Sequence, residues 1–82
     1  MKLPRDLSGT ALAALLRRYG YETTRQTGSH LRLTSTLRGT EHHLSIPRHR
    51  PLRVGTLSSI LAEVAEYVRR EREDVAEELF GR

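Results

Sequence analysis

The sequence predicts an α+β fold of the order α-β-β-β-α, in which two helices cover one face of a three-stranded antiparallel sheet. Apolar residues recur at helical spacing near both ends of the chain, whereas residues 21–27 are rich in aromatic and β-branched types and residues 30–36 and 41–46 alternate as strands do. The connections are short, which favours an antiparallel meander. Because 82 residues leave room for one core, we expect a single domain over 1–82, with a core at about 7–68 and an acidic helical tail at about 69–82.

The first helix is expected between Ser8, which can cap its start, and Gly20, which can end it. Between them, apolar residues at i, i+3, i+4 and i+7 form one stripe that can face a core. This stripe consists of Leu12, Leu15, Leu16 and Tyr19.

Three strands are expected after the first helix, over Tyr21–Thr27, His30–Thr36 and Glu41–Ile46. Gly28-Ser29 separates the first two, a loop with Gly39 at its tip separates the last two, and Pro47 ends the third. Alternation gives the sheet an apolar face toward the helices, with Leu31, Leu33, Leu44 and Ile46. The opposite face is expected to stay open to solvent and to carry His30, Arg32, Thr34, His43 and Ser45.

The second helix is expected to begin with Thr56 as its N-cap. Its apolar stripe consists of Leu57, Ile60, Leu61, Val64 and Val68. A weaker apolar spacing continues through Val75, Leu79 and Phe80 to Gly81, so the tail is either an extension of this helix or a separate short one.

The charge divides the chain into two parts. Up to Thr56, ten cations face three acidic residues, a net charge of +7, whereas the remainder carries four arginines against seven acidic residues, a net charge of −3. A basic body suits a polyanion such as nucleic acid, although solvated charge without a partner explains it equally well. Thirteen of the fourteen cations are arginine, which can bind phosphate through two donors at once.

The composition also excludes several classes of protein. There is no cysteine for a disulfide or a thiolate metal site, and the longest apolar run, Ala11–Leu16, is far shorter than a membrane span. Because residues 1–6 lack the apolar region of a signal peptide, we expect a cytoplasmic protein that neither enters a membrane nor needs a cofactor.

His30 is the leading candidate for chemistry. It follows a glycine and a serine at the start of a strand, where a tight turn would hold the imidazole near backbone N–H groups. Histidine can take a proton from a hydroxyl and return one to a leaving oxygen. An exposed strand histidine without function is the alternative, and it is favoured as long as the short Gly-Ser-His motif is considered alone.

The other polar candidates are weaker. His42 and His43 are neighbours on a strand, so they point to opposite faces and cannot easily share a metal ion. Ser29 cannot form a triad with His30, because adjacent strand residues diverge and no carboxylate lies nearby in the sequence. His49 lies in a basic loop, and Gly55-Thr56 either caps the second helix or offers its free N–H groups to a phosphate.

Three motifs occur in the order and spacing of a known family. Arg25-Gln26-Thr27-Gly28-Ser29-His30, Ile46-Pro47-x-His49 and Gly55-Thr56-Leu57-x-x-Ile60-Leu61 resemble the HicA (YcfA-like) family of toxin–antitoxin mRNA interferases. The resemblance covers about Leu7 to Val64. It implies a fold like that of the double-stranded RNA-binding domain, and it implies that His30 is the catalytic residue of a ribonuclease that cleaves mRNA without the ribosome.

The resemblance also implies a partner, a HicB-like antitoxin that covers the catalytic surface and commonly lets the complex repress its own operon. The chain departs from the family pattern at Thr23 and Thr24, where many members have aliphatic residues, and in its acidic tail. Lysine is nearly absent where many members are lysine-rich, although arginine can make the same phosphate contacts.

The leading hypothesis is therefore a metal-independent endoribonuclease in which a ribose 2′-hydroxyl is the nucleophile and His30 is general base or acid. The substrate-binding set consists of Gly28, Ser29, Arg25, Arg32, Arg48 and His49, with His43 as a candidate secondary participant. A non-catalytic RNA-binding module is the alternative. A third interpretation makes the domain chiefly a protein-interaction element, whose acidic tail contacts the antitoxin or a second copy of the chain.

Overall fold

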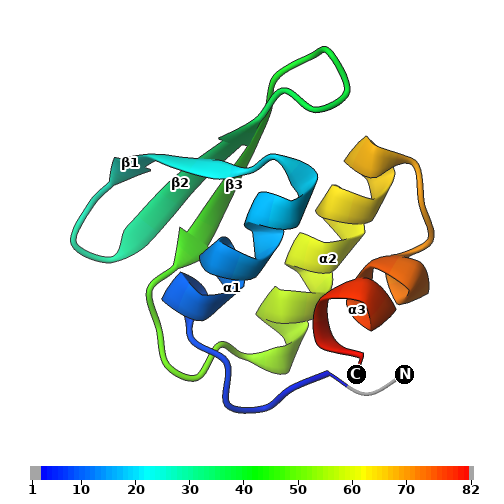
Figure 1. Ribbon diagram of the computed structural model, residues 1–82. Helices are drawn as coiled ribbons and strands as arrows, with labels where there is room; N and C mark the ends of the chain where they lie inside the picture. The colour runs from blue at the N-terminus through cyan, green and yellow to red at the C-terminus, as the bar shows by residue number, and fades with distance from the viewer. Residues whose placement is uncertain (1–2, 82) are drawn as a thin grey trace.

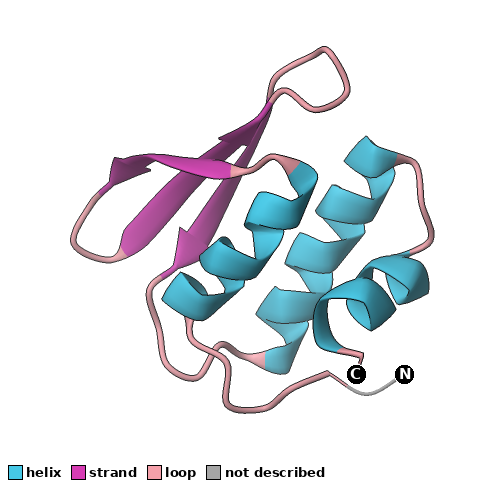
Figure 2. Cartoon of the chain, in the orientation of Figure 1, coloured by secondary structure: helices cyan, strands magenta, loops and turns pink. Residues whose placement is uncertain are grey.

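The computed structural model describes residues 3–81. Its elements are helix α1 (Gly9–Leu15), a 3₁₀ turn η1 (Leu16–Tyr19), strands β1 (Glu22–Gln26), β2 (His30–Ser35) and β3 (His42–Pro47), and helices α2 (Val54–Val68) and α3 (Arg72–Phe80). The strands form one antiparallel sheet in the order β1-β2-β3. Helices α1 and α2 lie on one side of this sheet, and α3 lies against α2 (Figures 1 and 2). The predicted α-β-β-β-α order and antiparallel sheet are confirmed.

The first helix begins and ends where the sequence predicts. The Ser8 hydroxyl accepts the Ala11 N–H at 3.0 Å, and Gly20 closes the segment in the left-handed region at φ 82°. Its last turn is 3₁₀ rather than α-helical, so the predicted single helix is α1 followed by η1.

The second helix begins earlier than predicted. Arg53, not Thr56, is its N-cap residue, because Leu57 N–H already donates to Arg53 C=O at 2.9 Å. The preceding Leu52 is buried, and its N–H donates to Leu7 C=O at 2.7 Å, which fixes the chain just before the helix. Gly55 and Thr56 therefore lie inside the first turn of α2, and the N-cap predicted for Thr56 is wrong.

The tail forms a separate helix. Arg69 ends α2 in the left-handed region at φ 61°, and the chain turns before α3 begins at Arg72. Val75 and Ala76 of α3 are buried in the same cluster as the sheet and the other helices.

The core contains the apolar stripes of both helices and the predicted inner face of the sheet. Leu31, Leu33, Leu44 and Ile46 are all buried, as alternation predicts. Coverage of the sheet is uneven, since α1 packs on β2 and β3 and α2 packs on β3, whereas all five residues of β1 are exposed. The uncovered β1 coincides with Thr23 and Thr24, where the sequence has no large apolar residue to bury.

Candidate functional site

The turn between β1 and β2 holds His30 at the start of its strand. Thr27 N–H donates to His30 C=O at 2.9 Å, and His30 N–H donates to the Thr27 hydroxyl at 3.1 Å. These two bonds close the turn over Gly28 and Ser29, so the backbone of His30 is fixed on both sides. The tight turn predicted at this position is present.

The imidazole of His30 is exposed and has one free ring nitrogen. Its Nδ1 lies 3.0 Å from the hydroxyl of Ser29. Among residues 3–81, Nε2 has no hydrogen-bond partner. A histidine that is held at Nδ1 and free at Nε2 can exchange a proton with a bound molecule.

His30 borders a hollow of about 430 Å³ between the end of β3 and one side of α2. Sequence reasoning found no carboxylate near His30, yet the fold brings Glu63 of α2 to the same hollow. The signal that could have identified it is the i, i+4, i+8 spacing of Gly55, Ser59 and Glu63, which places small and polar residues on one side of α2. The hollow is lined by His30, Ser45, Pro47, Gly55, Thr56, Ser59, Ile60 and Glu63.

A β-bulge brings two arginines together beside His30. The register of β1 against β2 shifts between Thr23 and Arg25, after which Arg25 pairs directly with Arg32. Paired residues share a face, so both guanidinium groups belong to the open face, and Arg32 lies two residues along β2 from His30. Two like charges directly opposite each other repel, and a bound anion would relieve this cost. Alternation alone does not reveal this pair, because it depends on the bulge.

The structure separates Arg48 and His49 from this group. The backbone N–H of Arg48 donates to Ser29 C=O at 2.9 Å, in the turn before His30. The side chain of Arg48, however, lines a groove on the helix side of the sheet. His49 lies in the loop after β3, and its carbonyl accepts the Gly9 N–H at 3.1 Å. His30, Arg25 and Arg32 thus share one face, whereas the Arg48 side chain lies on the other side of the sheet and His49 belongs to the loop beyond β3.

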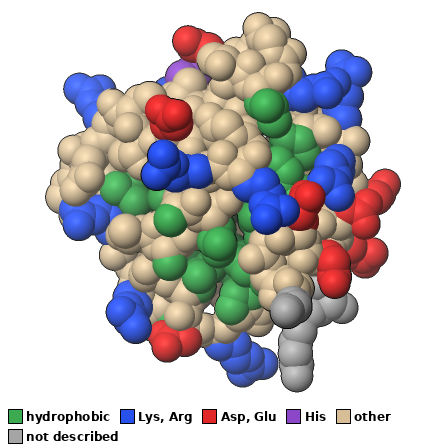
Figure 3. All heavy atoms as spheres, viewed as in Figure 1, with side chains coloured by type: hydrophobic (Ala, Val, Ile, Leu, Met, Phe, Trp, Pro, Cys, Tyr) green, Lys and Arg blue, Asp and Glu red, His purple; other side chains and the backbone are tan. Residues whose placement is uncertain are grey.

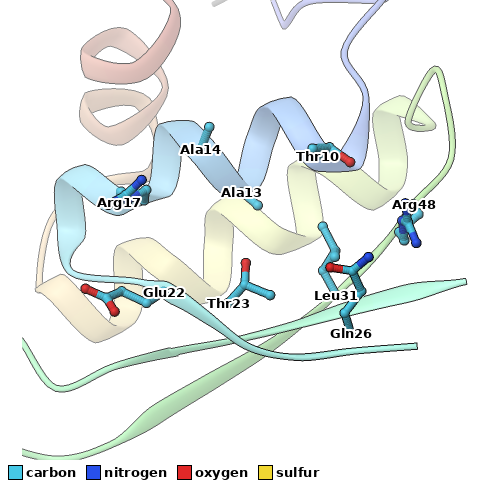
Figure 4. Close-up of a pocket in the computed structure, with 9 residues that line it drawn as sticks. All are labelled: Thr10, Ala13, Ala14, Arg17, Glu22, Thr23, Gln26, Leu31 and Arg48. Carbon is cyan, nitrogen blue, oxygen red and sulfur yellow. The ribbon is translucent and has the colours of Figure 1, made fainter. Parts of the chain in front are cut away.

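The groove that holds Arg48 lies between α1 and β1 and has a volume of about 410 Å³. Figure 4 shows Thr10 and Arg48 at one end and Arg17 and Glu22 at the other. The groove lies where Ala13 of α1 points toward the small Thr23 side chain of β1, and Ala14 is also among its lining residues. It belongs to the opposite side of the sheet from the His30 face.

The two adjacent histidines of β3 have different surroundings. His42 is on the helix side, where its Nδ1 lies 2.8 Å from the Tyr21 hydroxyl and its ring stacks on Tyr67 at 4.8 Å between centroids. Burial of Tyr21 raises the pKa of its phenol above the ordinary value. His43 is on the open face, where it pairs with Thr34, four residues along β2 from His30.

The charged side chains are unevenly distributed over the surface. On the face shown in Figure 3, several acidic side chains gather on the side where α3 lies, whereas arginines and a few single acidic side chains are spread over the rest. Within residues 3–81, no group of three or more His, Asp or Glu side chains could hold a metal ion. None of the described helices has the length and apolar character needed to cross a bilayer.

A family model described as the HicA toxin of bacterial toxin–antitoxin systems matches residues 9–65, from the start of α1 into α2. The chain belongs to the HicA toxin family. Membership in the HicA family implies a cognate antitoxin as partner. Helix α3 lies outside the matched segment. No curated protein and no solved structure matches the chain.

Proposed function

We propose that this HicA toxin is an endoribonuclease that cleaves mRNA with His30 as general acid–base catalyst. The observation that carries the proposal is the exposed imidazole of His30, with its free Nε2, on the same face as the paired Arg25 and Arg32. The open face therefore offers a proton-transfer group next to two phosphate-binding groups. This combination suits the cleavage of a phosphodiester.

The proposed reaction uses the substrate's own nucleophile. His30 takes the proton of a ribose 2′-hydroxyl, and the oxygen attacks the adjacent phosphorus as the bond to the 5′-oxygen of the next nucleotide breaks. The leaving oxygen receives a proton from the protonated His30 or from water, and the products are a 2′,3′-cyclic phosphate and a 5′-hydroxyl. Arg25 and Arg32 stabilise the negative charge that grows on the phosphoryl oxygens. The backbone of Gly28 and Ser29 positions the histidine. Arg48 and His49 have no part in this step.

The proposal is tested by cleavage of a labelled single-stranded RNA in the presence of a chelator. The wild-type chain should cleave, and His30→Ala should lower the rate by about 10²- to 10⁴-fold, the usual contribution of a positioned acid–base group. Arg72→Ala, on α3, removes one arginine outside the proposed site and should cleave at the wild-type rate.

Four results would contradict the proposal. Full activity of His30→Ala would remove His30 from the mechanism, and loss of wild-type activity on chelation would exclude a metal-independent reaction. Cleavage of an RNA that carries a 2′-deoxyribose at the scissile position would exclude the 2′-hydroxyl as nucleophile. RNA binding without any cleavage would favour a non-catalytic RNA-binding module.

A further inference from the structure

A connected array of side chains surrounds His43 on the open face. His43 Nδ1 lies 2.9 Å from the Thr34 hydroxyl, which lies 3.0 Å from the Thr24 hydroxyl, which donates to Arg32 C=O at 3.3 Å. The carbonyl can only accept, so all these bonds form together when Thr24 donates to it, Thr34 donates to Thr24 and His43 Nδ1–H donates to Thr34. The array thus crosses all three strands and fixes the direction of each bond.

The second ring nitrogen of His43 is also engaged. Nε2 lies 3.4 Å from a carboxylate oxygen of Glu41, an ion pair when the ring is protonated. The contact of Nδ1 with Thr34 holds the orientation of the ring, and the Glu41 carboxylate lies beside the other nitrogen. The His43 side chain nevertheless remains 40% exposed, so the ring is accessible to a ligand.

The three histidines of the sheet therefore differ in what they can offer to a ligand. His30 has a free nitrogen among the described residues, which suits proton transfer. The ring of His42 stacks on Tyr67. His43 has Nδ1 bonded to Thr34, Nε2 beside the Glu41 carboxylate and a side chain that is 40% exposed, which suits stacking better than proton transfer.

We propose that His43 is the stacking platform for one base of the RNA strand whose backbone lies along Arg25 and Arg32. This inference rests on the proposed function, since it needs RNA on the open face. Thr34, which pairs with His43, lies four residues from His30 on β2, a separation of about 13 Å at the usual strand rise. The stacked base therefore belongs to a nucleotide away from the scissile phosphate, and His43 reads or holds it without taking part in the reaction.

The chemistry of the face favours single-stranded RNA over a folded protein partner. Flat sheets with exposed rings bind unpaired bases by stacking, with cationic side chains beside them for the backbone. His43 supplies the ring, and Arg25 and Arg32 supply the cations on the same face.

The test measures RNA binding in a His30→Ala background, so that the substrate stays intact. A labelled oligoribonucleotide is compared with versions that carry a single abasic site at each position in turn. We expect one abasic position to weaken binding by about tenfold, within the range known for one base on one aromatic side chain. His43→Ala should weaken binding of the intact RNA by the same factor and abolish the effect of that abasic site, whereas His43→Phe should preserve both.

The outcomes separate this inference from the proposed function. Binding by His43→Ala equal to that of its parent, or an abasic effect that persists in His43→Ala, would overturn the stacking role. Absence of RNA binding by the wild-type chain would overturn both proposals. Binding that follows the expected pattern with no cleavage by the wild-type chain would overturn the nuclease alone. Because His43 is exposed, circular dichroism of each variant should match that of its parent.

Discussion

At the scale of single residues, the Ser35 side chain joins two separate segments of the chain through hydrogen bonds. It is the one buried polar side chain among the described residues, at the end of β2. Its hydroxyl donates to Tyr19 C=O at 2.7 Å and accepts the Leu37 N–H at 3.1 Å. One side chain thus joins the end of η1 to the β2–β3 loop.

Ser35→Ala should therefore destabilise the protein by about 1–3 kcal/mol, because it leaves a buried carbonyl and an N–H without a partner. Urea denaturation measures this difference. Thr36→Ala, one residue further along the chain and exposed, should change the free energy of unfolding by no more than about 0.5 kcal/mol. Equal effects of the two substitutions would contradict the role of Ser35.

The candidate site shows what residue patterns can and cannot predict. Alternation identifies His30, Arg32 and His43 as open-face residues, because a strand has a fixed period. It cannot reveal that a bulge pairs Arg25 with Arg32, that Arg48 points to the helix side, or that Glu63 approaches His30 from α2. These three facts depend on register and on packing between distant segments.

At the scale of elements, the groove between α1 and β1 results from small side chains on both walls. Thr23 is on the helix side of β1, opposite Ala13. Thr23→Ile should be more stable than Thr23→Val by about 0.8 kcal/mol, because the extra methylene is buried in the groove. Valine is the matched control, since it removes the same hydroxyl and is also β-branched. Equal unfolding free energies of the two variants would show that the groove does not accept the added carbon.

Helix α3 is part of the core as well as a charged surface. Val75 is fully buried, so the apolar side of α3 packs within the chain and not against a partner. Val75→Ala should cost about 2 kcal/mol, from lost burial and the cavity left behind. Glu73→Ala on the exposed side of α3 should change stability little. Thermal denaturation compares the two, and an unchanged midpoint for Val75→Ala would show that α3 is dispensable for folding.

The elements themselves were largely predictable from the sequence, and their ends were not. Ser8 and Gly20 mark the first helix correctly because each acts through local bonds or local backbone geometry. Thr56 was a plausible cap by residue type, but the contact between Leu52 and Leu7 fixes the chain earlier. Arg69, and not a glycine, ends α2 in the left-handed region, so the residue pattern does not predict whether the tail continues this helix.

At the scale of the whole molecule, polar contacts of Glu78 join α3 to η1 and to the turn after α2. It accepts a hydrogen bond from the Tyr19 hydroxyl, lies 2.5 Å from Arg70 and 3.4 Å from Arg18. The Tyr19 bond, followed by the two arginines, lowers the pKa of Glu78 below its ordinary value. Burial and the nearby carboxylate raise the pKa of Tyr19 to about 12.

These opposite shifts predict the pH range over which the hydrogen bond between Tyr19 and Glu78 stabilises the fold. Glu78 contributes above its unfolded pKa, and this contribution is lost as pH falls through the lower folded pKa. Tyr19 contributes below about pH 10, and its contribution is lost as pH rises toward about 12. The difference in unfolding free energy between wild type and Tyr19→Phe should therefore be constant from about pH 5 to 10 and shrink on either side. A difference that is independent of pH would contradict a stabilising role of the hydrogen bond between Tyr19 and Glu78.

The division of charge also makes a prediction for the whole molecule. The formal net charge is only +4, but four of the ten acidic residues lie in α3, on the helix side of the sheet and away from the arginines of the open face. Binding of single-stranded RNA should weaken with salt, with a slope of log K against log salt of about −0.7 for each phosphate contact. In a His30→Ala background, replacing both Arg25 and Arg32 with alanine should make this slope shallower by about 1.4, since two contacts are lost.

Arg72→Ala removes a cation from α3 and should leave the slope unchanged, because the acidic side chains around it keep the RNA backbone away. If Arg72→Ala lowered the slope as much per charge as the open-face pair does, then net charge and not the arrangement of the open face would govern RNA binding.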